Sequence, residues 1–203
     1  MGFDEAALMW DNEQRIGRAK VIARQIYNEI KTEQNLRALE FGCGTGLVSF
    51  NLADKFEHIT LLDTSGGMIE MLNKKIKEAG ITNMSAFQAD INDNPAMYGS
   101  FDVIYSSMAL HHIADVRTTL ANLYTLLQSS GYLCIVDLNE DDGSFHKAEK
   151  DFSGHNGFDQ NALKGLTEEL GYKNATVNTF YQGDKIMDDT KVPYSLFLLS
   201  ARK

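Results

Sequence analysis

The stretch Glu40-Phe41-Gly42-Cys43-Gly44-Thr45-Gly46 decides the fold of this chain. It follows an apolar run at residues 36–39 and precedes a helix-like segment at residues 47–53. Glycine has no Cβ and adopts positive φ at little cost, so three alternate glycines let a ligand lie directly against the backbone. Open α/β sheets bind ligands at the carboxyl ends of parallel strands. The stretch therefore predicts a ligand site after the first strand.

Strand-like and helix-like segments alternate around this stretch. The expected strands cover residues 36–41, 59–63, 84–88, 101–107 and 132–138, and the expected helices cover residues 10–30, 47–53, 68–79 and 116–127. A polar stretch at 139–157 is expected to be a functional loop or a lid. A helix at 159–170 follows, then two strands at 175–181 and 194–201 that are joined by a polar turn containing Pro193. The alternation predicts an α/β fold, a doubly wound sheet with helices on both faces.

The composition fits one domain with no membrane or nucleic-acid partner. The chain has 203 residues, 43% of them hydrophobic and 23% charged, with a formal net charge of −9. Nucleic-acid binding depends on Lys and Arg, so an acidic chain disfavours it. Residues 1–5 contain two acids where a signal peptide would be basic, and no apolar run approaches the roughly 20 residues of a spanning helix. Two cysteines without a Cys-x-x-Cys pair fit a cytoplasmic location.

Three residues near the glycines narrow the choice of ligand. Asp63 ends the second expected strand 21 residues after Gly42, where nucleotide-binding sheets place an acid that accepts hydrogen bonds from ribose. An acid at a helix N-terminus is the alternative. A dinucleotide-binding fingerprint, Gly-x-Gly-x-x-Gly/Ala, needs a small residue three positions after Gly44. This chain has Leu47 there, which counts against a nicotinamide-dependent oxidoreductase. Glu40 would repel a pyrophosphate and would suit a ligand that carries an amine or another cation.

Five motifs in order resemble those of the class I S-adenosylmethionine-dependent methyltransferases that act on small molecules. The glycine stretch resembles their motif I, residues 59–69 their second motif, and Gln88-Ala89-Asp90-Ile91 their third. Residues 101–113 and 126–133 resemble the fourth strand with its loop and the approach to the fifth strand. The resemblance covers residues 35–138. It implies a Rossmann-like, three-layer fold with a seven-stranded, mostly parallel sheet, an antiparallel last strand, and S-adenosylmethionine as cofactor.

The resemblance also implies which residues contact the cofactor. Asp63 would bind the ribose, while Asp90 would accept from the adenine amino group or, alternatively, only order a turn. Glycine N–H groups would bind the methionyl carboxylate. The full expected set is Trp10, Glu40, Gly42, Cys43, Gly44, Gly46, Asp63, Thr64, Met68, Asp90, Ile91 and Ser106. Cys43 has no evident base partner, so the role of a nucleophile is not expected for its thiol.

No side chain is marked as catalytic, because methyl transfer mainly requires in-line placement of the acceptor. His111, His112 and His155 are candidate general bases, although packing or loop ordering is the favoured role for the first two. His146 falls in the polar loop and is expected in solvent. The histidines are too few for a metal site without clear carboxylate or thiol partners, so no metal is expected.

The expected organisation is one methyltransferase domain over residues 1–203. Residues 1–34 would form a helical lid, residues 35–138 the cofactor-binding core, and residues 139–203 the substrate-side loop, helix and terminal strands. Trp10 would contact the sulfonium or fasten the lid to the core. Basic residues of the lid helix would form a solvated face or, alternatively, meet an acidic substrate: Arg15, Arg18, Lys20 and Arg24.

The expected function is methyl transfer to a small-molecule acceptor, which yields S-adenosylhomocysteine. The alternative is a non-catalytic module that binds S-adenosylmethionine or regulates a partner. Neither the acceptor atom nor the oligomeric state follows from the residues.

Overall fold

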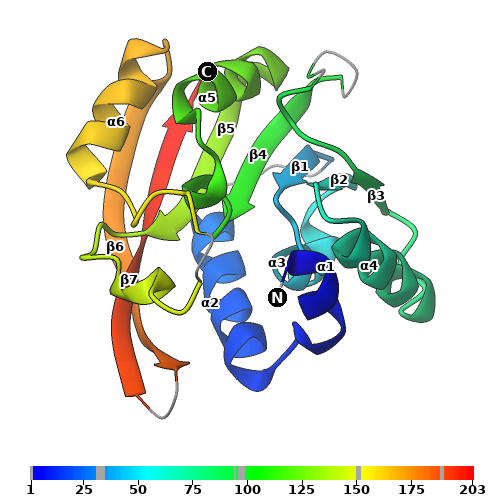
Figure 1. The fold of residues 1–203 in the computed structure, drawn as a ribbon. Coiled ribbons are helices and arrows are strands. Elements are labelled where there is room, and N and C mark those ends of the chain that lie inside the picture. Colours follow the sequence, from blue (N-terminus) through cyan, green and yellow to red (C-terminus); the bar gives the residue numbers. More distant parts are fainter. Residues whose placement is uncertain (1, 31–34, 94, 96–98, 150–151, 188–189) are drawn as a thin grey trace.

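The computed structural model describes residues 2–30, 35–93, 95, 99–149, 152–187 and 190–203 (Figure 1). Within these residues the strands are β1 (Arg37–Phe41), β2 (His58–Asp63), β3 (Met84–Gln88), β4 (Phe101–Ser107), β5 (Leu127–Leu138), β6 (Lys173–Met187) and β7 (Thr190–Arg202). The α-helices are α1 (Phe3–Ala6), α2 (Glu13–Ile30), α3 (Leu47–Phe50), α4 (Gly66–Glu78), α5 (Val116–Leu126) and α6 (Gln160–Glu169). Short 3-10 helices are η1 (Ala7–Met9), η2 (Ala53–Lys55), η4 (Leu110–His112) and η5 (Ser144–His146).

The strands form one sheet in the order β3-β2-β1-β4-β5-β7-β6. The five strands from β3 to β5 in this order pair in parallel. Strand β7 lies antiparallel to both of its neighbours, β5 and β6. The expected seven-stranded, mostly parallel sheet with an antiparallel last strand is therefore confirmed.

Two apolar cores lie on the two faces of the sheet. Helices α2, α3 and α4 pack on one face, where alternate strand residues such as Ala38 and Val103 are fully buried. Helices α5 and α6 pack on the other face, against residues such as Leu39 and Ile104. Since successive side chains of a strand point to opposite faces, strands buried on both faces have nearly continuous apolar sequences. The three layers can be followed in Figure 1.

The terminal hairpin is longer than the sequence predicted. Pro193 lies inside β7, opposite Asp184 of β6, so the expected turn around this proline is wrong. The pairing of β5 with β7 ends at Leu138 and Leu196. The part of β7 that contains Pro193 therefore pairs only with β6, and proline is tolerated where one side of the strand needs no ladder hydrogen bond.

The N-terminal segment also differs from the expected single helix over residues 10–30. Helix α2 begins at Glu13, because the side chain of Asn12 accepts a hydrogen bond from the Arg15 N–H at 2.9 Å and caps the helix. Before it, α1 and η1 form a separate small unit that packs on α4. Among the helices of the described residues, none has both the length and the apolar character needed to cross a bilayer.

Candidate cofactor and acceptor site

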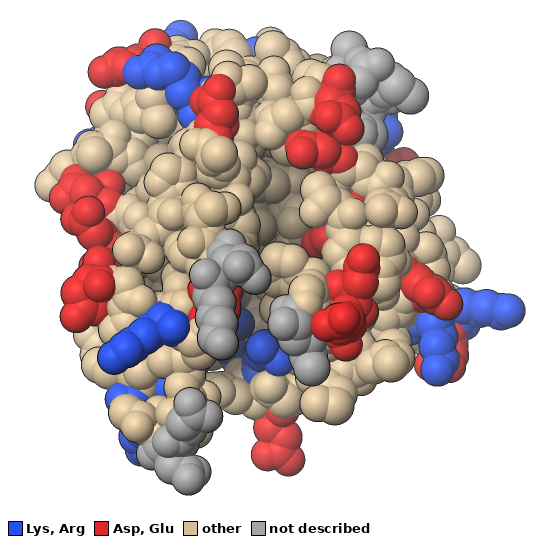
Figure 2. Space-filling view, viewed as in Figure 1, with Lys and Arg blue, Asp and Glu red and all other residues tan. Residues whose placement is uncertain are grey.

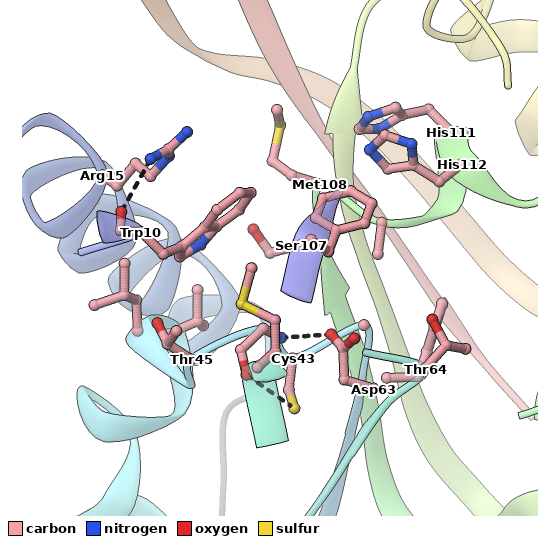
Figure 3. Close-up of a pocket in the computed structure, with 18 of the residues that line it drawn as sticks. Trp10, Arg15, Cys43, Thr45, Asp63, Thr64, Ser107, Met108, His111 and His112 are labelled. Carbon is pink, nitrogen blue, oxygen red and sulfur yellow. Dashed lines mark hydrogen bonds between the residues drawn. The ribbon is translucent and has the colours of Figure 1, made fainter. Parts of the chain in front are cut away.

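A pocket of about 950 Å³ opens at the carboxyl ends of β1, β2 and β4. Strand β1 leads to α3 on one face of the sheet, whereas β4 leads to α5 on the other. Parallel sheets leave a crevice at such a switch point, because the two connections diverge. Figure 2 shows the resulting hollow, with basic atoms along its lower margin, and Figure 3 shows the residues inside it.

The three glycines of the opening stretch have different roles. All three adopt positive φ, between +52° and +79°. A Cβ at Gly42 would lie 2.2 Å from Ala109, and one at Gly46 would lie 2.6 Å from Leu72, so these two glycines permit close packing. A Cβ at Gly44 would meet only Trp10, at 3.7 Å. Gly44 is thus the glycine that leaves its backbone open to the pocket, whereas Gly46 does not line it.

Asp63 holds the glycine stretch from the end of β2. Its carboxylate accepts a hydrogen bond from the Gly44 N–H at 2.7 Å (Figure 3). It also accepts one from the Ser65 N–H at 2.9 Å. An ionised carboxylate has about four acceptor positions, so about two remain for a ligand. Burial is the main cause that raises the pKa of Asp63.

Glu40 is a buried acid at the floor of the pocket. Only 2% of the residue is exposed, and its carboxylate accepts a hydrogen bond from the Ser49 hydroxyl, which also contacts the Tyr105 hydroxyl at 2.5 Å. Burial, assisted by the negative charge of Asp63, raises the pKa of Glu40 to about 8. The site therefore holds an acid that a bound cation would ionise.

Most of the other expected cofactor residues also line the pocket. They are Trp10, Cys43, Thr64, Met68, Asp90 and Ile91. Asp90 accepts a hydrogen bond from the Asn92 N–H at 2.8 Å, so it orders the following turn while it faces the pocket. Ser106 does not reach the pocket, because its hydroxyl is buried in the sheet and donates to the Phe41 carbonyl at 2.9 Å. The next residue, Ser107, lines the pocket instead.

Cys43 is a buried spacer in the glycine stretch. Burial and the nearby acids Glu40 and Asp63 raise the pKa of its thiol, so the thiolate needed for nucleophilic attack is disfavoured. Its N–H donates to the Leu62 carbonyl at 3.0 Å and joins the stretch to β2.

The N-terminal segment covers the pocket and is fastened at two points. Asp4 accepts hydrogen bonds from the Ser65 hydroxyl at 2.5 Å and the Gly67 N–H at 2.9 Å, at the start of α4. Asp11 bonds to Thr45 and forms an ion pair with Lys75 at 2.6 Å. Between these points, the Trp10 ring lies beside the glycine stretch under the guanidinium of Arg15, 4.1 Å from the ring centre.

We expect Lys75→Ala to loosen this segment. The loss of a partly exposed ion pair costs about 1 kcal/mol, which shifts an opening equilibrium up to about fivefold. Trp10 is the single tryptophan of the chain, so its fluorescence reports on the segment. Its emission should shift to the red and acrylamide should quench it more strongly. Lys74→Ala removes the neighbouring lysine, which pairs with Glu78, and should change neither signal. Equal quenching in the two variants would contradict the fastening role.

Three histidines gather at the far side of the pocket. His111 is buried, and its Nδ1 lies 2.5 Å from a carboxylate oxygen of Asp137. His146, expected in solvent, is instead 3% exposed and stacks on Phe152 with ring centres 3.7 Å apart. The expectation fails because η5 folds this part of the polar loop into the protein. Burial is the main cause that lowers the pKa of His146 to about 4. His112 is more exposed to solvent, but desolvation by the groups packed around its ring, followed by the charge of His111, also lowers its pKa to about 4, so both rings are neutral at neutral pH.

His155 does not line the pocket, so it is too far from a bound acceptor to act as its general base. Its N–H donates to the His111 carbonyl at 2.7 Å, and its Nε2 lies 3.0 Å from the Ile113 carbonyl. It therefore braces the backbone of η4, on which His111 and His112 stand.

Comparisons with known proteins agree with this architecture. The family model for a methyltransferase domain matches residues 38–131. An uncharacterised methyltransferase of Schizosaccharomyces pombe is 28% identical over 178 residues, which cover 81% of this chain and 63% of the relative. An O-methyltransferase of Aspergillus nomiae is 29% identical over 180 residues, which cover 81% of this chain and 78% of the relative.

A solved structure has the same fold. The S-adenosylmethionine-dependent methyltransferase of Aquifex aeolicus superposes with a TM-score of 0.70 at 14% identity, over 98% of this chain and 97% of that one. With the sheet topology, these likenesses show that residues 38–131 match the methyltransferase-domain family and that the chain has the fold of the class I methyltransferases.

Proposed function

We propose that this protein transfers the methyl group of S-adenosylmethionine to a small, negatively charged acceptor. The observation that supports the cofactor most directly is the open backbone of Gly44, flanked by Asp63 on one side and Glu40 beneath. S-adenosylmethionine carries an ammonium and a sulfonium for Glu40 and ribose hydroxyls for Asp63. Adenine would lie against Met68 and Ile91.

The N–H groups of Gly44 and Gly46, which were expected from the sequence to bind the methionyl carboxylate, instead donate to Asp63 and to the Cys43 carbonyl. The methionyl part would therefore lie against the Gly44 backbone without those two hydrogen bonds.

The acceptor would enter from the side of α2 and β6. Arg15 and Arg18 of α2 and Lys185 of β6 line this part of the pocket. The sequence favoured a solvated face for the two arginines, but Arg18 donates to the Tyr194 hydroxyl at 3.0 Å across the pocket wall. Lys185 is paired with Glu149 at 3.0 Å, so the two arginines are the cations that would favour an acceptor bearing a carboxylate or phosphate. The relative from Aspergillus nomiae is an O-methyltransferase, which fits an oxygen nucleophile.

Turnover separates this proposal from a module that only binds the cofactor. The protein is incubated with methyl-labelled S-adenosylmethionine and a panel of acids paired with their neutral amides or esters. Formation of S-adenosylhomocysteine together with a labelled acid supports the proposal. Tight cofactor binding without turnover across the panel would favour the non-catalytic alternative. Exclusive methylation of the neutral compounds would contradict the role of Arg15 and Arg18.

Cofactor binding should release a proton from Glu40. At pH 7 a carboxyl group with a pKa of about 8 is mostly protonated, and a bound cation lowers that pKa, so binding releases up to about one proton. The affinity should therefore rise up to about tenfold per pH unit until the pH passes this pKa.

Titration calorimetry at pH 7 in buffers of different ionisation enthalpy measures this release. The Glu40→Gln variant should release up to about one proton fewer per cofactor bound, because glutamine does not ionise. Glu78→Gln, at the exposed end of α4, should release as many protons as the unmodified protein. Equal proton release with and without Glu40 would place the cofactor's cations elsewhere.

A further inference from the structure

The three histidines of the pocket form a group that methyl transfer does not account for. His111 and His112 come from η4 and His146 from η5. Each offers one ring nitrogen, and these three atoms lie within 4.8 Å of one another. Three nitrogens around a tetrahedral ion at about 2.05 Å would be about 3.4 Å apart, so closing the group needs a movement of roughly an ångström.

His111 is already oriented as metal-ligating histidines are. Its Nδ1 is held by Asp137, which is fully buried and also accepts from the backbone N–H groups of His111 at 3.1 Å and Leu138 at 2.7 Å. This leaves Nε2 to face the group. A carboxylate behind a histidine fixes the ring and raises its basicity as a ligand.

His146 carries the strongest sign of a missing ligand. Both of its ring nitrogens are buried, and neither makes a hydrogen bond to any residue that the structure describes. A buried polar nitrogen without a partner destabilises the fold unless a ligand satisfies it. The ring is also fixed in place by stacking on Phe152.

We propose that His111, His112 and His146 bind a divalent transition-metal ion of the zinc type at the acceptor end of the pocket. Imidazole ligands suit zinc, copper, nickel and iron and are poor ligands for magnesium or calcium. The sequence predicted no metal because it left the histidines without a partner; Asp137 and the fold of η5 supply what was missing.

The ion would keep one coordination position open. Three protein ligands with a free fourth position are typical of catalytic rather than structural zinc sites. All three histidines line the pocket, so water or an acceptor atom would fill that position.

The use of this position rests on the proposed methyl transfer. An acceptor hydroxyl or thiol bound there would release its proton to solvent. Its lone pair would then attack the methyl carbon while the sulfonium C–S bond breaks, leaving S-adenosylhomocysteine.

Metal binding is tested on the untagged protein, because a polyhistidine tag would bind the same ions. After treatment with a chelator, the protein is titrated with Co²⁺ and then with Zn²⁺, without cofactor or acceptor. We expect one equivalent of Co²⁺, strong visible absorption typical of four- or five-coordination, and its displacement by Zn²⁺. Since cofactor and acceptor are absent, this result does not depend on the proposed methyl transfer.

Variants assign the ion to the group. His146→Ala should weaken Co²⁺ binding at least about 100-fold and abolish the absorption. His112→Ala, at an exposed position, gives the same test with less risk to folding. His58→Gln removes a histidine at the start of β2, outside the pocket, and should bind as the unmodified protein does. Absence of saturable binding, weak octahedral-type absorption, or equal affinity in all variants would overturn the proposal.

Discussion

Gly44→Val should abolish S-adenosylmethionine binding. The added side chain would project from the glycine stretch toward Trp10, into the space where the methionyl part is expected to lie. Ligand and valine cannot share this space, so we expect the affinity to fall at least about 100-fold, or about 2.7 kcal/mol. Titration calorimetry with S-adenosylmethionine and S-adenosylhomocysteine measures the loss.

A matched control separates this effect from backbone strain. Gly44 has φ +52°, where valine is strained by about 2 kcal/mol, so the variant also loses stability. Gly80, just after α4, has φ +65° and no neighbouring atom within 4 Å of a Cβ. Gly80→Val should therefore lose a similar amount in thermal unfolding while it binds the cofactor normally. Retained binding in Gly44→Val would refute the contact between ligand and backbone.

Asp63→Ala should have the second largest effect on cofactor binding. The variant loses the expected acceptor of two ribose hydroxyls and also the acceptor that holds the Gly44 N–H. Hydrogen bonds to a charged group contribute about 1.5–3 kcal/mol each, so we expect at least about a 100-fold weaker affinity. Asp102→Ala is the control, because Asp102 accepts from the Arg37 N–H at 2.9 Å, outside the pocket.

A cofactor analogue without ribose hydroxyls isolates the contact itself. In the unmodified protein, the deoxyribose form of S-adenosylhomocysteine should bind much more weakly than S-adenosylhomocysteine. In Asp63→Ala this difference should nearly vanish, because the partner of the hydroxyls is gone. If the analogue is penalised equally in both proteins, the ribose lies elsewhere and Asp63 acts only on the loop.

Local patterns were sufficient to predict the central sheet. Apolar runs of the right length lie in β1, β2, β4 and β5, and positive-φ glycines follow β1 at the point where the chain must turn sharply. Ser65 and Asp159 begin helices by accepting from backbone N–H groups three residues later. Such signals depend on neighbouring residues, so they can be recognised without the tertiary structure.

The histidine side of the pocket could not be predicted in this way. His146 is in a polar segment, and no local signal shows that η5 returns to η4 or that Phe152 covers its ring. No local signal shows the partner of Asp137 or of Lys75 either. The sequence pattern predicts only that Asp137 ends a strand and that Lys75 lies on an exposed face of α4. Their partners lie 26 and 64 residues away in the chain.

The sequence by itself determined the sheet, the glycine stretch and the acids at the strand ends, because periodicity and turn chemistry act over a few residues. Only the tertiary structure decided which glycine opens to the pocket, which serine is enclosed in the sheet, and which histidines meet. Those outcomes depend on how the carboxyl ends of β1, β2 and β4 converge with the N-terminal segment and η5. Contacts between distant segments are set by packing, and packing is a property of the whole chain.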